Sequence, residues 1–247
     1  MARAPLPEGP DSRVPSRVPS GAPDQAGTDL YRVAAPIYDL CTALWSGGAI
    51  WRSRRCQIEA MQPGESVLYA GGGTGRAAVE AARRGMRVTL ADRSPAMLAK
   101  AQARALRAGV EIEWLQTDLW DYQPEVRFDH VCANHFFNVY GEADMQRMRA
   151  RLMGWLVPGG SLHIADFRPL VGGRLARMAQ RVHHAIPLAG CSAFTRNALH
   201  PIYDHDRWGE QQPGRLQVQD HRMWWIGPGW YRTWRLETES RTPAQPT

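Results

Sequence analysis

Four short apolar runs in the first half of the chain predict buried β-strands, because each is short for a helix and is bounded by glycine, proline or acidic residues. They lie at residues 67–70, 87–92, 112–119 and 128–133. Segments with the pattern of helices lie between and after them, at residues 77–84, 95–107, 144–156 and 173–184. The first two strands and the helix between them have the order of a βαβ unit.

The second half of the chain predicts one more buried strand and a C-terminal hairpin. Residues 161–165 form the strand, directly after a Pro-Gly-Gly helix stop. Residues 215–225 and 230–237 predict antiparallel strands on either side of a Gly-Pro-Gly turn. Residues 187–214 have no regular pattern, so we expect an irregular segment there.

The connection after the first strand, residues 71–75, reads Gly-Gly-Gly-Thr-Gly. Glycine adopts positive φ without strain and lets the backbone lie against a ligand, while the helix that follows offers unpaired N–H groups. The loop predicts a site for a ligand bound through its polar atoms. The alternative is a tight strand-to-helix connection that binds nothing.

Two acidic residues at the ends of the next strands favour a nucleoside-containing ligand. Asp92 ends the second strand, where a carboxylate can accept hydrogen bonds from both hydroxyl groups of a ribose. It also precedes Ser94 and Pro95, so a helix cap is the alternative role. Asp118 ends the third predicted strand, where it could accept a hydrogen bond from an adenine amino group. Three strand ends with suitable groups together predict a nucleoside cofactor.

Length, charge and cysteine content limit the classes of partner. The 247 residues suit one sizeable α/β domain, and the formal net charge of +6 comes without a basic run that would make a nucleic-acid track. Positive charge would also suit an anionic membrane leaflet. The four cysteines form no C-x-x-C pair, and no apolar run suggests a membrane span or signal peptide. We therefore expect a cytoplasmic protein, with any membrane contact peripheral and on the inner face of the cytoplasmic membrane.

The N-terminal region divides into a tail and a helical segment. Residues 1–28 are rich in Pro, Ser, Gly and Ala and predict a disordered tail, whereas residues 29–247 are expected to form one domain. Residues 29–62 predict helices, including an amphipathic one over residues 44–61. Its apolar face suits the protein core better than a membrane.

Five motifs follow one another as they do in class I S-adenosylmethionine (SAM) dependent methyltransferases, which the chain resembles over about residues 30–238. They are residues 67–75, Asp92-Arg93-Ser94-Pro95-Ala96-Met97-Leu98, Asp118, Phe128-Asp129-His130-Val131 and Leu156-Val157-Pro158-Gly159-Gly160. The resemblance implies an α/β fold with a doubly wound, mostly parallel, seven-stranded Rossmann-like sheet and an antiparallel C-terminal hairpin. It also implies a lid formed by residues 29–62 and a substrate-pocket insertion at residues 187–214.

The same resemblance implies that SAM binds at the carboxyl ends of the first strands. The implied contacts are Tyr38, Tyr69, Gly71, Gly72, Gly73, Thr74, Gly75, Asp92, Arg93, Met97, Asp118, Leu119 and Asn134. Tyr38 belongs to an Ala-x-x-Tyr-Asp segment similar to one in quinone-modifying and phospholipid-modifying methyltransferases. Packing of the lid on the sheet is the alternative role for Tyr38.

Tyr69 departs from the family pattern, because most of these enzymes carry Asp or Glu there and use the acid to hold the charged α-amino group of SAM. Loss of a charge-assisted hydrogen bond of about 1.5–3 kcal/mol would lower the pKa of that amine by roughly one to two units and favour its neutral, nucleophilic form. An aromatic residue beside this glycine loop resembles the rhodoquinone biosynthesis proteins. Those proteins are understood to use SAM as an amino donor to ubiquinone, with manganese as the expected metal.

The leading hypothesis is therefore a SAM-utilising enzyme that replaces a methoxy group of ubiquinone by an amino group. One alternative is ordinary methyl transfer to a quinone, a phospholipid or another small hydrophobic molecule, with Tyr69 as a tolerated substitution. A second alternative is a non-enzymatic SAM-binding protein, in which the altered motif marks lost chemistry.

Asn134 and His135 follow the fourth strand, at the edge that faces the SAM sulfur and the substrate in this family. We expect them, together with Tyr69, to be the catalytic residues, with Asn134 and His135 orienting a carbonyl or moving a proton. A structural role is the alternative for His135. Phe136 and Phe137 would suit a flat quinone ring.

Other polar and aromatic residues leave more than one interpretation. Asp166 and Arg168 border the same cleft or form a surface ion pair. His200, Asp204, His205 and Asp206 could ligate manganese or zinc, but their spacing fits no metal motif and favours helix capping and exposed polar positions, so the metal ligands are unassigned. The tryptophans of the C-terminal hairpin either pack against the last helix or lie at a membrane interface. These are Trp224, Trp225, Trp230 and Trp234.

Overall fold

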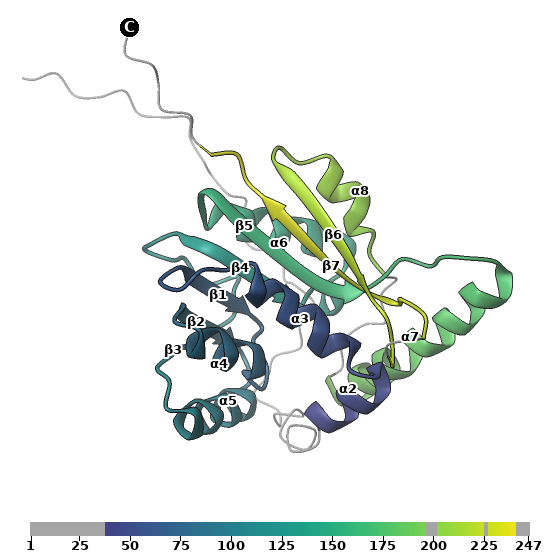
Figure 1. Cartoon of the computed structure of the whole chain (residues 1–247), viewed down its shortest axis with the longest axis horizontal. Helices are drawn as coiled ribbons and strands as arrows, with labels where there is room; N and C mark the ends of the chain where they lie inside the picture. Colours follow the sequence, from purple (N-terminus) through teal and green to yellow (C-terminus); the bar gives the residue numbers. More distant parts are fainter. Residues whose placement is uncertain (1–37, 196–201, 225–226, 241–247) are drawn as a thin grey trace, which may run out of the picture.

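Residues 38–195, 202–224 and 227–240 are described by the computed structural model, in which seven strands form one sheet (Figure 1). The strands are β1 (Ser66–Ala70), β2 (Arg87–Asp92), β3 (Glu113–Gln116), β4 (Phe128–Asn134), β5 (Leu156–Phe167), β6 (Arg215–His221) and β7 (Tyr231–Glu237). Their order is β3-β2-β1-β4-β5-β7-β6, with β7 antiparallel to both neighbours and the other pairs parallel. The expected sheet with an antiparallel C-terminal hairpin is confirmed.

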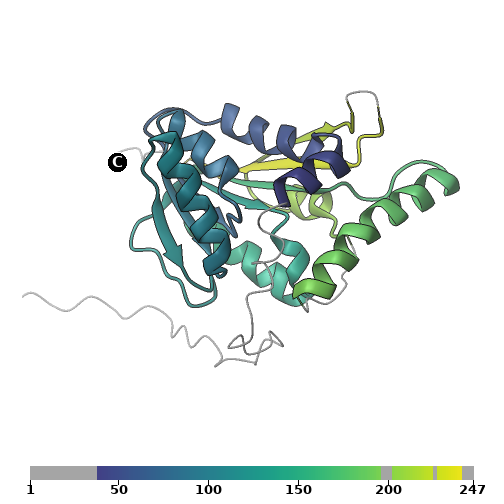
Figure 2. The ribbon, with the colours of Figure 1, turned by 90° about the horizontal axis from the view of Figure 1, so that it is seen from below.

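Helices cover both faces of this sheet (Figures 1 and 2). They are α2 (Tyr38–Ser46), α3 (Ala49–Glu59), α4 (Arg76–Arg83), α5 (Pro95–Ala108), the 3-10 helix η1 (Phe137–Val139), α6 (Glu142–Gly154), α7 (Arg174–Thr195) and α8 (His205–Glu210). Residues of α3, α4 and α5 pack on one face, and residues of α6 pack on the other.

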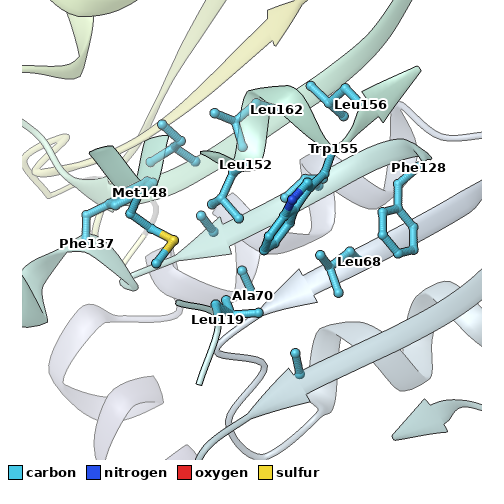
Figure 3. Packing of buried hydrophobic residues seen from close by; sticks show 14 of the residues in the cluster. Leu68, Ala70, Leu119, Phe128, Phe137, Met148, Leu152, Trp155, Leu156 and Leu162 are labelled. Carbon is cyan, nitrogen blue, oxygen red and sulfur yellow. The ribbon is translucent and has the colours of Figure 1, made fainter. Parts of the chain in front are cut away.

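Alternation along β1 explains how one sheet supports two cores. Leu68 and Ala70 lie in the core that contains Leu152 of α6 (Figure 3). Val67 and Tyr69 lie in the opposite core, against α3, α4 and α5. Successive side chains of a strand point to opposite faces, and a parallel strand covered on both faces reads as a continuous apolar run. That is why the apolar run at residues 67–70 predicted a buried strand.

Three strands have limits that differ from the prediction by several residues. β6 ends at His221, so the strand predicted through residue 225 is too long. β3 ends at Gln116, so the strand predicted through residue 119 is too long. Asp118 lies in the turn that follows, where its carbonyl accepts a hydrogen bond from the Asp121 N–H at 3.0 Å. β5 begins at Leu156 rather than at residue 161, so the Pro-Gly-Gly sequence that was taken as a helix stop lies within β5, where Gly159 has φ of 83° and the register with β4 shifts.

Two helical regions also differ from the prediction. The segment 187–214 is not irregular throughout, since α7 continues past Pro187 to Thr195 and α8 forms after Asp204. The helix predicted over residues 44–61 is two helices, because Gly47 and Gly48 have φ of 54° and 78° and end α2 before α3 begins. Proline and glycine favour the end of a helix, but packing around the helix also decides where it ends.

Some predictions fall outside the described residues: the tail at 1–28, the first part of the lid at 29–37, His200 and Trp225. In the segments that the structure covers, no helix combines the length and apolar character needed to cross a membrane.

Candidate active site

The connection between β1 and α4 is tight because three of its glycines adopt the left-handed conformation. Gly71, Gly73 and Gly75 have φ of 63°, 56° and 71°, which other residues adopt only with strain. A Cβ on Gly72 would lie 2.4 Å from Cγ of Leu90, so this loop lies flat against β2. The backbone therefore comes closer to β2 than a side chain at residue 72 would allow.

Gly73 faces the open side of this loop, where an added Cβ would meet nothing within 4 Å. Its N–H donates to Oδ2 of Asp92 at 2.8 Å, and Oδ1 of Asp92 accepts from the Ser94 N–H at 2.9 Å. Ser94 caps α5 by accepting from the Met97 N–H at 3.2 Å. The capping role thus belongs to Ser94, whereas Asp92 ties the glycine loop to the end of β2.

Asp118 and Arg93 form an ion pair next to this edge, with Nη1 of Arg93 3.3 Å from Oδ2 of Asp118. The other carboxylate oxygen accepts from the Trp120 N–H at 3.0 Å. Because both side chains are partly exposed, the pair contributes little stability. Met97 and Leu119, two further predicted contacts, are each only 3% exposed.

Three polar residues, here called the clamp, join α2 to the glycine loop and α5. Oγ1 of Thr74 donates to Oδ1 of Asp39 at 2.8 Å, while Arg104 pairs with Asp39 and donates to the Thr74 carbonyl at 2.7 Å. Burial acts to raise the pKa of Asp39, but hydrogen bonds from Arg104 and Thr74 outweigh it and hold this pKa below its usual value. Sequence reasoning missed Arg104. The side chain of Tyr38, just before the clamp, lies outside the described part.

Tyr69 is 3% exposed, and its hydroxyl has no hydrogen-bond partner among the residues that the structure describes. Its side chain packs in the core beneath α3 and α4, next to Cys132 on the adjacent strand β4. Burial raises the pKa of the phenol well above its usual value, Cys132 adds to this, and Arg54 opposes it. The hydroxyl therefore stays neutral at any ordinary pH.

Two guanidinium groups border this end of the loop. Arg54 on α3 acts electrostatically on Tyr69, and its buried Nε has no partner among the described residues. Arg76, the first residue of α4, has a pKa lowered mainly by burial, with Arg54 adding to the effect and Asp39 opposing it. Asp39 is already paired within the clamp, and Glu80 pairs with Arg84 at 3.2 Å. Each nearby carboxylate is thus already engaged.

Asn134 ends β4, and its side chain is oriented by α3. Nε2 of Gln57 donates to Oδ1 of Asn134 at 2.8 Å, and Gln57 is 1% exposed. This bond fixes which end of the Asn134 amide remains for a ligand, because the carbonyl oxygen is occupied and the NH₂ group can still donate.

His135 is held in an unusual backbone conformation, with φ of 51° in the left-handed region. Its Nδ1 lies 3.4 Å from Oδ1 of Asp166, the buried acid near the end of β5. That oxygen also accepts from Nδ2 of Asn138 at 2.9 Å and from the Phe167 N–H at 2.7 Å. Burial acts to raise the pKa of Asp166, but the hydrogen bonds and the nearby histidines outweigh it and lower this pKa. The carboxylate therefore stays ionised beside the imidazole.

The other nitrogen of His135 is left to act on a ligand. Nε2 is buried and has no partner among the described residues, while the ring packs edge-on against Phe167 and Tyr231 at 5.3 and 6.3 Å. An Nδ1–H directed at Asp166 would leave Nε2 as an acceptor. The arrangement can take a proton from a bound molecule and return it.

Phe136 and Phe137 pack edge-to-face, with ring centroids 5.5 Å apart, but differ in what else they contact. A Cβ on Gly71 would lie 2.6 Å from the Phe136 ring, so this ring lies over the glycine loop. Phe137 is fully buried in the α6 core (Figure 3), which makes the prediction that it faces a quinone wrong. Phe137 is the first residue of the 3-10 helix η1, and its side chain points into the core.

The remaining polar predictions are partly corrected. Asp204 does cap α8, accepting from the N–H groups of Asp206 and Arg207. His205 is not an exposed polar residue, since it is 1% exposed and its Nδ1 lies 3.2 Å from Nη1 of Arg149. In the described segments no group of three or more His, Cys, Asp or Glu residues could hold a metal ion, so manganese stays a prediction without a ligand set.

Arg168 and three tryptophans of the C-terminal hairpin lie in different environments. Arg168 pairs with Asp220 at 2.9 Å and not with Asp166. Trp234 is 1% exposed in the α6 core and Trp230 packs against buried residues, whereas Trp224 is 57% exposed. The hairpin tryptophans thus serve different purposes.

Sequence comparison identifies related proteins. A family model described as a methyltransferase domain matches residues 67–160. The chain is 32% identical over 145 residues to a demethylmenaquinone methyltransferase of Thermus thermophilus, covering 57% of this chain and 65% of that protein. It is 35% identical over 85 residues to a ubiquinone/menaquinone biosynthesis C-methyltransferase of Zymomonas mobilis, covering 34% of this chain and 35% of that protein. The alignments thus span less than two thirds of these relatives.

Solved structures share the fold at low identity. Magnesium protoporphyrin IX methyltransferase from Synechocystis, with S-adenosylhomocysteine bound, has a TM-score of 0.57 and 17% identity over 79% of this chain and 84% of that one. A Burkholderia thailandensis 1,6-didemethyltoxoflavin-N1-methyltransferase, also with S-adenosylhomocysteine, has a TM-score of 0.58 and 18% identity over 85% and 88%.

The strand order and the glycine loop after β1 define a Rossmann-like methyltransferase fold. Residues 67–160 are similar to a methyltransferase domain, and the chain shares the fold of the solved methyltransferases.

The buried histidine beside this site predicts acid sensitivity. His184 is 2% exposed, and burial lowers its pKa to about 4. In the unfolded chain His184 takes up a proton near pH 6.5, whereas in the folded chain it does so only near pH 4. The contribution of His184 to the free energy of unfolding is therefore lost as the pH falls from about 6.5 to about 4, and it does not change above that window. Urea unfolding across this range should give a slope that His184→Gln reduces by about 1 kcal/mol per pH unit. An unchanged slope in the variant would contradict the assignment.

Proposed function

We propose that this protein binds SAM at the carboxyl ends of β1 and β2 and uses it as an amino donor, replacing a methoxy group of ubiquinone by an amino group. Rhodoquinone would be the product. The observation that carries the proposal is Tyr69, a buried neutral phenol at the position where most members of the superfamily hold the SAM ammonium with an acid.

The glycine loop and its neighbours fit SAM. Residues 71–75 lie close against β2, and the open side of Gly73 would face the cofactor. Asp92 can accept from the ribose hydroxyls next to the loop that it already orders. Asp118 stands at the next strand end for the adenine. The relatives with bound S-adenosylhomocysteine have the same fold.

The charges around Tyr69 favour a neutral amine on the donor. The phenol supplies no negative charge, Arg54 acts on the phenol from α3, and Asp39 is already engaged by Arg104. A cation near an amine disfavours its ammonium form, as does the loss of a carboxylate. The amine pKa should therefore fall by at least the roughly one to two units that the lost charge-assisted bond represents. A larger share of the bound SAM then carries a nucleophilic nitrogen.

The residues at the end of β4 supply the proton transfers for the first bond change. The SAM nitrogen attacks the ring carbon that bears the methoxy group, the carbon–nitrogen bond forms, and the carbon–oxygen bond breaks to release methanol. Nε2 of His135 takes the proton from the nitrogen and returns it to the departing oxygen, while Asp166 stabilises the imidazolium. The NH₂ group of Asn134 donates to a quinone carbonyl oxygen.

A second bond change frees the nitrogen from SAM: the Cα–H and N–H protons move to the two quinone oxygens while the ring takes up the electron pair of the Cα–H bond. Water then hydrolyses the resulting imine to rhodoquinol, the reduced form of rhodoquinone, and the 2-oxo acid derived from SAM.

Methyl transfer to a quinone is the second candidate, and the relatives favour it. The names of the Thermus and Zymomonas proteins describe methyltransferases of quinone biosynthesis. The same fold and site would serve an attack of a substrate carbon or oxygen on the SAM methyl group, where catalysis is mainly positioning.

Mass spectrometry of the quinone distinguishes the two. The purified protein is incubated with SAM and a short-chain ubiquinone, with and without manganese. A product lighter by the difference between methoxy and amino groups supports amination, and a product heavier by one methylene supports methylation. Intact SAM and unchanged quinone with every candidate would favour a binding protein without this chemistry.

The glycine loop gives a prediction for cofactor binding. Gly73→Ala should keep the fold but weaken S-adenosylhomocysteine binding at least tenfold in calorimetry, because the new methyl group projects toward the ligand side. Gly109→Ala is the matched control: Gly109 has φ of 65°, similarly open surroundings and a place at the end of α5. Both substitutions carry a similar backbone cost of about 1–2 kcal/mol. Equal binding by the two variants would argue against SAM at this loop.

Tyr69 gives a prediction for the choice of reaction. Tyr69→Asp should still bind SAM but lose amination at least tenfold, since a restored carboxylate raises the amine pKa by roughly one to two units. Tyr69→Phe should retain most amination, because the hydroxyl makes no hydrogen bond among the described residues. Product formation is followed by mass spectrometry and cofactor binding by calorimetry. Full amination by the aspartate variant would refute the charge argument.

His135 and Asp166 give a prediction for proton transfer. His135→Gln should lower kcat by about 10²–10⁴-fold with little change in SAM affinity. Asp166→Asn should lower kcat less and shift the pH profile of kcat, because it acts through the imidazole as a positioning residue. If SAM binding fell as much as kcat in both variants, the two residues would be structural.

A further inference from the structure

Exposed apolar side chains gather on α2, α7 and one turn. Of the ten large apolar residues found exposed in the described part of the chain, seven lie in these three segments. They are Leu40 (62% exposed), Leu44 (58%), Leu175 (82%), Met178 (62%), Val182 (56%), Ile186 (51%) and Trp224 (57%), and together they are called the apolar surface. Scattered exposed leucines need no explanation, but such a concentration marks an interaction site.

Contacts between the three segments hold the apolar surface together. Trp45 of α2 stacks on His183 of α7, with ring centroids 4.8 Å apart and planes 11° from parallel. The Trp224 N–H donates to the Gly47 carbonyl at 3.2 Å, and a Cβ on Gly47 would lie 2.4 Å from the Trp224 nitrogen. Figures 1 and 2 both show α7 extending beside α2. Segments far apart in the chain thus present one region to the outside.

The apolar side chains of α7 are not left over from packing on the protein. The helix already buries one face, through Gln180, His183 and His184. Leu175, Met178 and Val182 recur at intervals of three and four residues and remain exposed. A helix that packs one face on its own protein normally exposes polar residues on the other. The exposed stripe therefore needs a partner outside the described residues.

The charge of α7 identifies the chemistry of that partner. Arg174, Arg177 and Arg181 are exposed among the apolar residues, and residues 174–186 contain no acid. None of these arginines forms an ion pair with the described residues. Apolar side chains interleaved with arginines are typical of helices that lie in the interface of an anionic bilayer, where each cation adds about 1 kcal/mol.

We infer that the apolar surface docks on an anionic membrane, with α7 lying along the headgroup region. Trp224 supports this, since an exposed indole is favoured at that depth. It is held in a left-handed conformation, with φ of 48°, that the space at Gly47 permits.

The same geometry connects the membrane to the candidate active site. On its buried side α7 brings His184 within 4.3 Å of the Phe167 ring, which packs against His135. The buried side of α7 is thus linked to His135 through one aromatic ring, that of Phe167. Docking itself does not depend on which group the protein transfers.

Vesicle co-sedimentation with the full chain tests the inference, without SAM or quinone. The protein should bind vesicles of phosphatidylcholine with phosphatidylglycerol, bind phosphatidylcholine alone at least tenfold more weakly, and release with added salt. The triple variant Leu175→Ser, Met178→Ser and Val182→Ser should lose at least tenfold in binding to the anionic vesicles. The charge variant Arg174→Gln, Arg177→Gln and Arg181→Gln should lose binding and most of the salt dependence.

Matched controls use exposed residues elsewhere on the protein. Leu106→Ser, Val126→Ser and Val218→Ser remove three exposed apolar side chains outside the apolar surface, and Arg83→Gln, Arg107→Gln and Arg215→Gln remove three exposed cations. Both controls should bind like the parent protein, and circular dichroism should show every variant folded.

Three outcomes would overturn the inference: no binding of the parent protein to either vesicle, equal loss in the apolar variant and its control, or equal binding to neutral and anionic vesicles. Because no reaction is measured, failure of docking is distinct from failure of the proposed amination.

Discussion

The close approach of the glycine loop to β2 is the constraint on which the candidate site depends. With no side chain between residue 72 and Leu90, the N–H of Gly73 reaches Asp92 and Thr74 reaches Asp39. One backbone path therefore orders the second strand end and the lid together. A larger residue at position 72 would separate β1 from β2 and release both contacts at once.

Around this loop, three carboxylates already have a positively charged or imidazole partner. The carboxylates of Asp39, Asp118 and Asp166 are each paired with a cation or an imidazole. The phenol of Tyr69 stays neutral, and Arg54 lies close enough to act on it. A ligand amine placed there would meet a neutral or positive environment, while the imidazole of His135 keeps one nitrogen unengaged at the other end of the site.

The sequence was a good guide to features that depend on neighbouring residues. Apolar runs located β1, β2 and β4, and the glycine cluster located the loop. It was a poor guide to pairs distant in the chain, such as Asp39 with Arg104 or Cys132 with Tyr69. Such pairs are made by the strand order and leave no local pattern.

The sequence also failed to predict side-chain direction and element length, for similar reasons. Phe136 and Phe137 are equally aromatic, and only the 3-10 turn decides which one is buried. The helix predicted over residues 173–184 is too short, since α7 continues through Pro187 to Thr195. The exposed stripe on α7 was also hidden in the sequence, since apolar residues at helical spacing predict a buried face by default.

At residue 135 the left-handed backbone favours glycine or asparagine, whereas the contact with Asp166 requires histidine. Glycine or asparagine would occupy that conformation more easily, by about 1–2 kcal/mol for glycine, but the buried Asp166 would lose its imidazole partner. Neither could replace the imidazole beside Asp166. A substitution that relieves the backbone at residue 135 therefore removes the proton-transfer group at the same time.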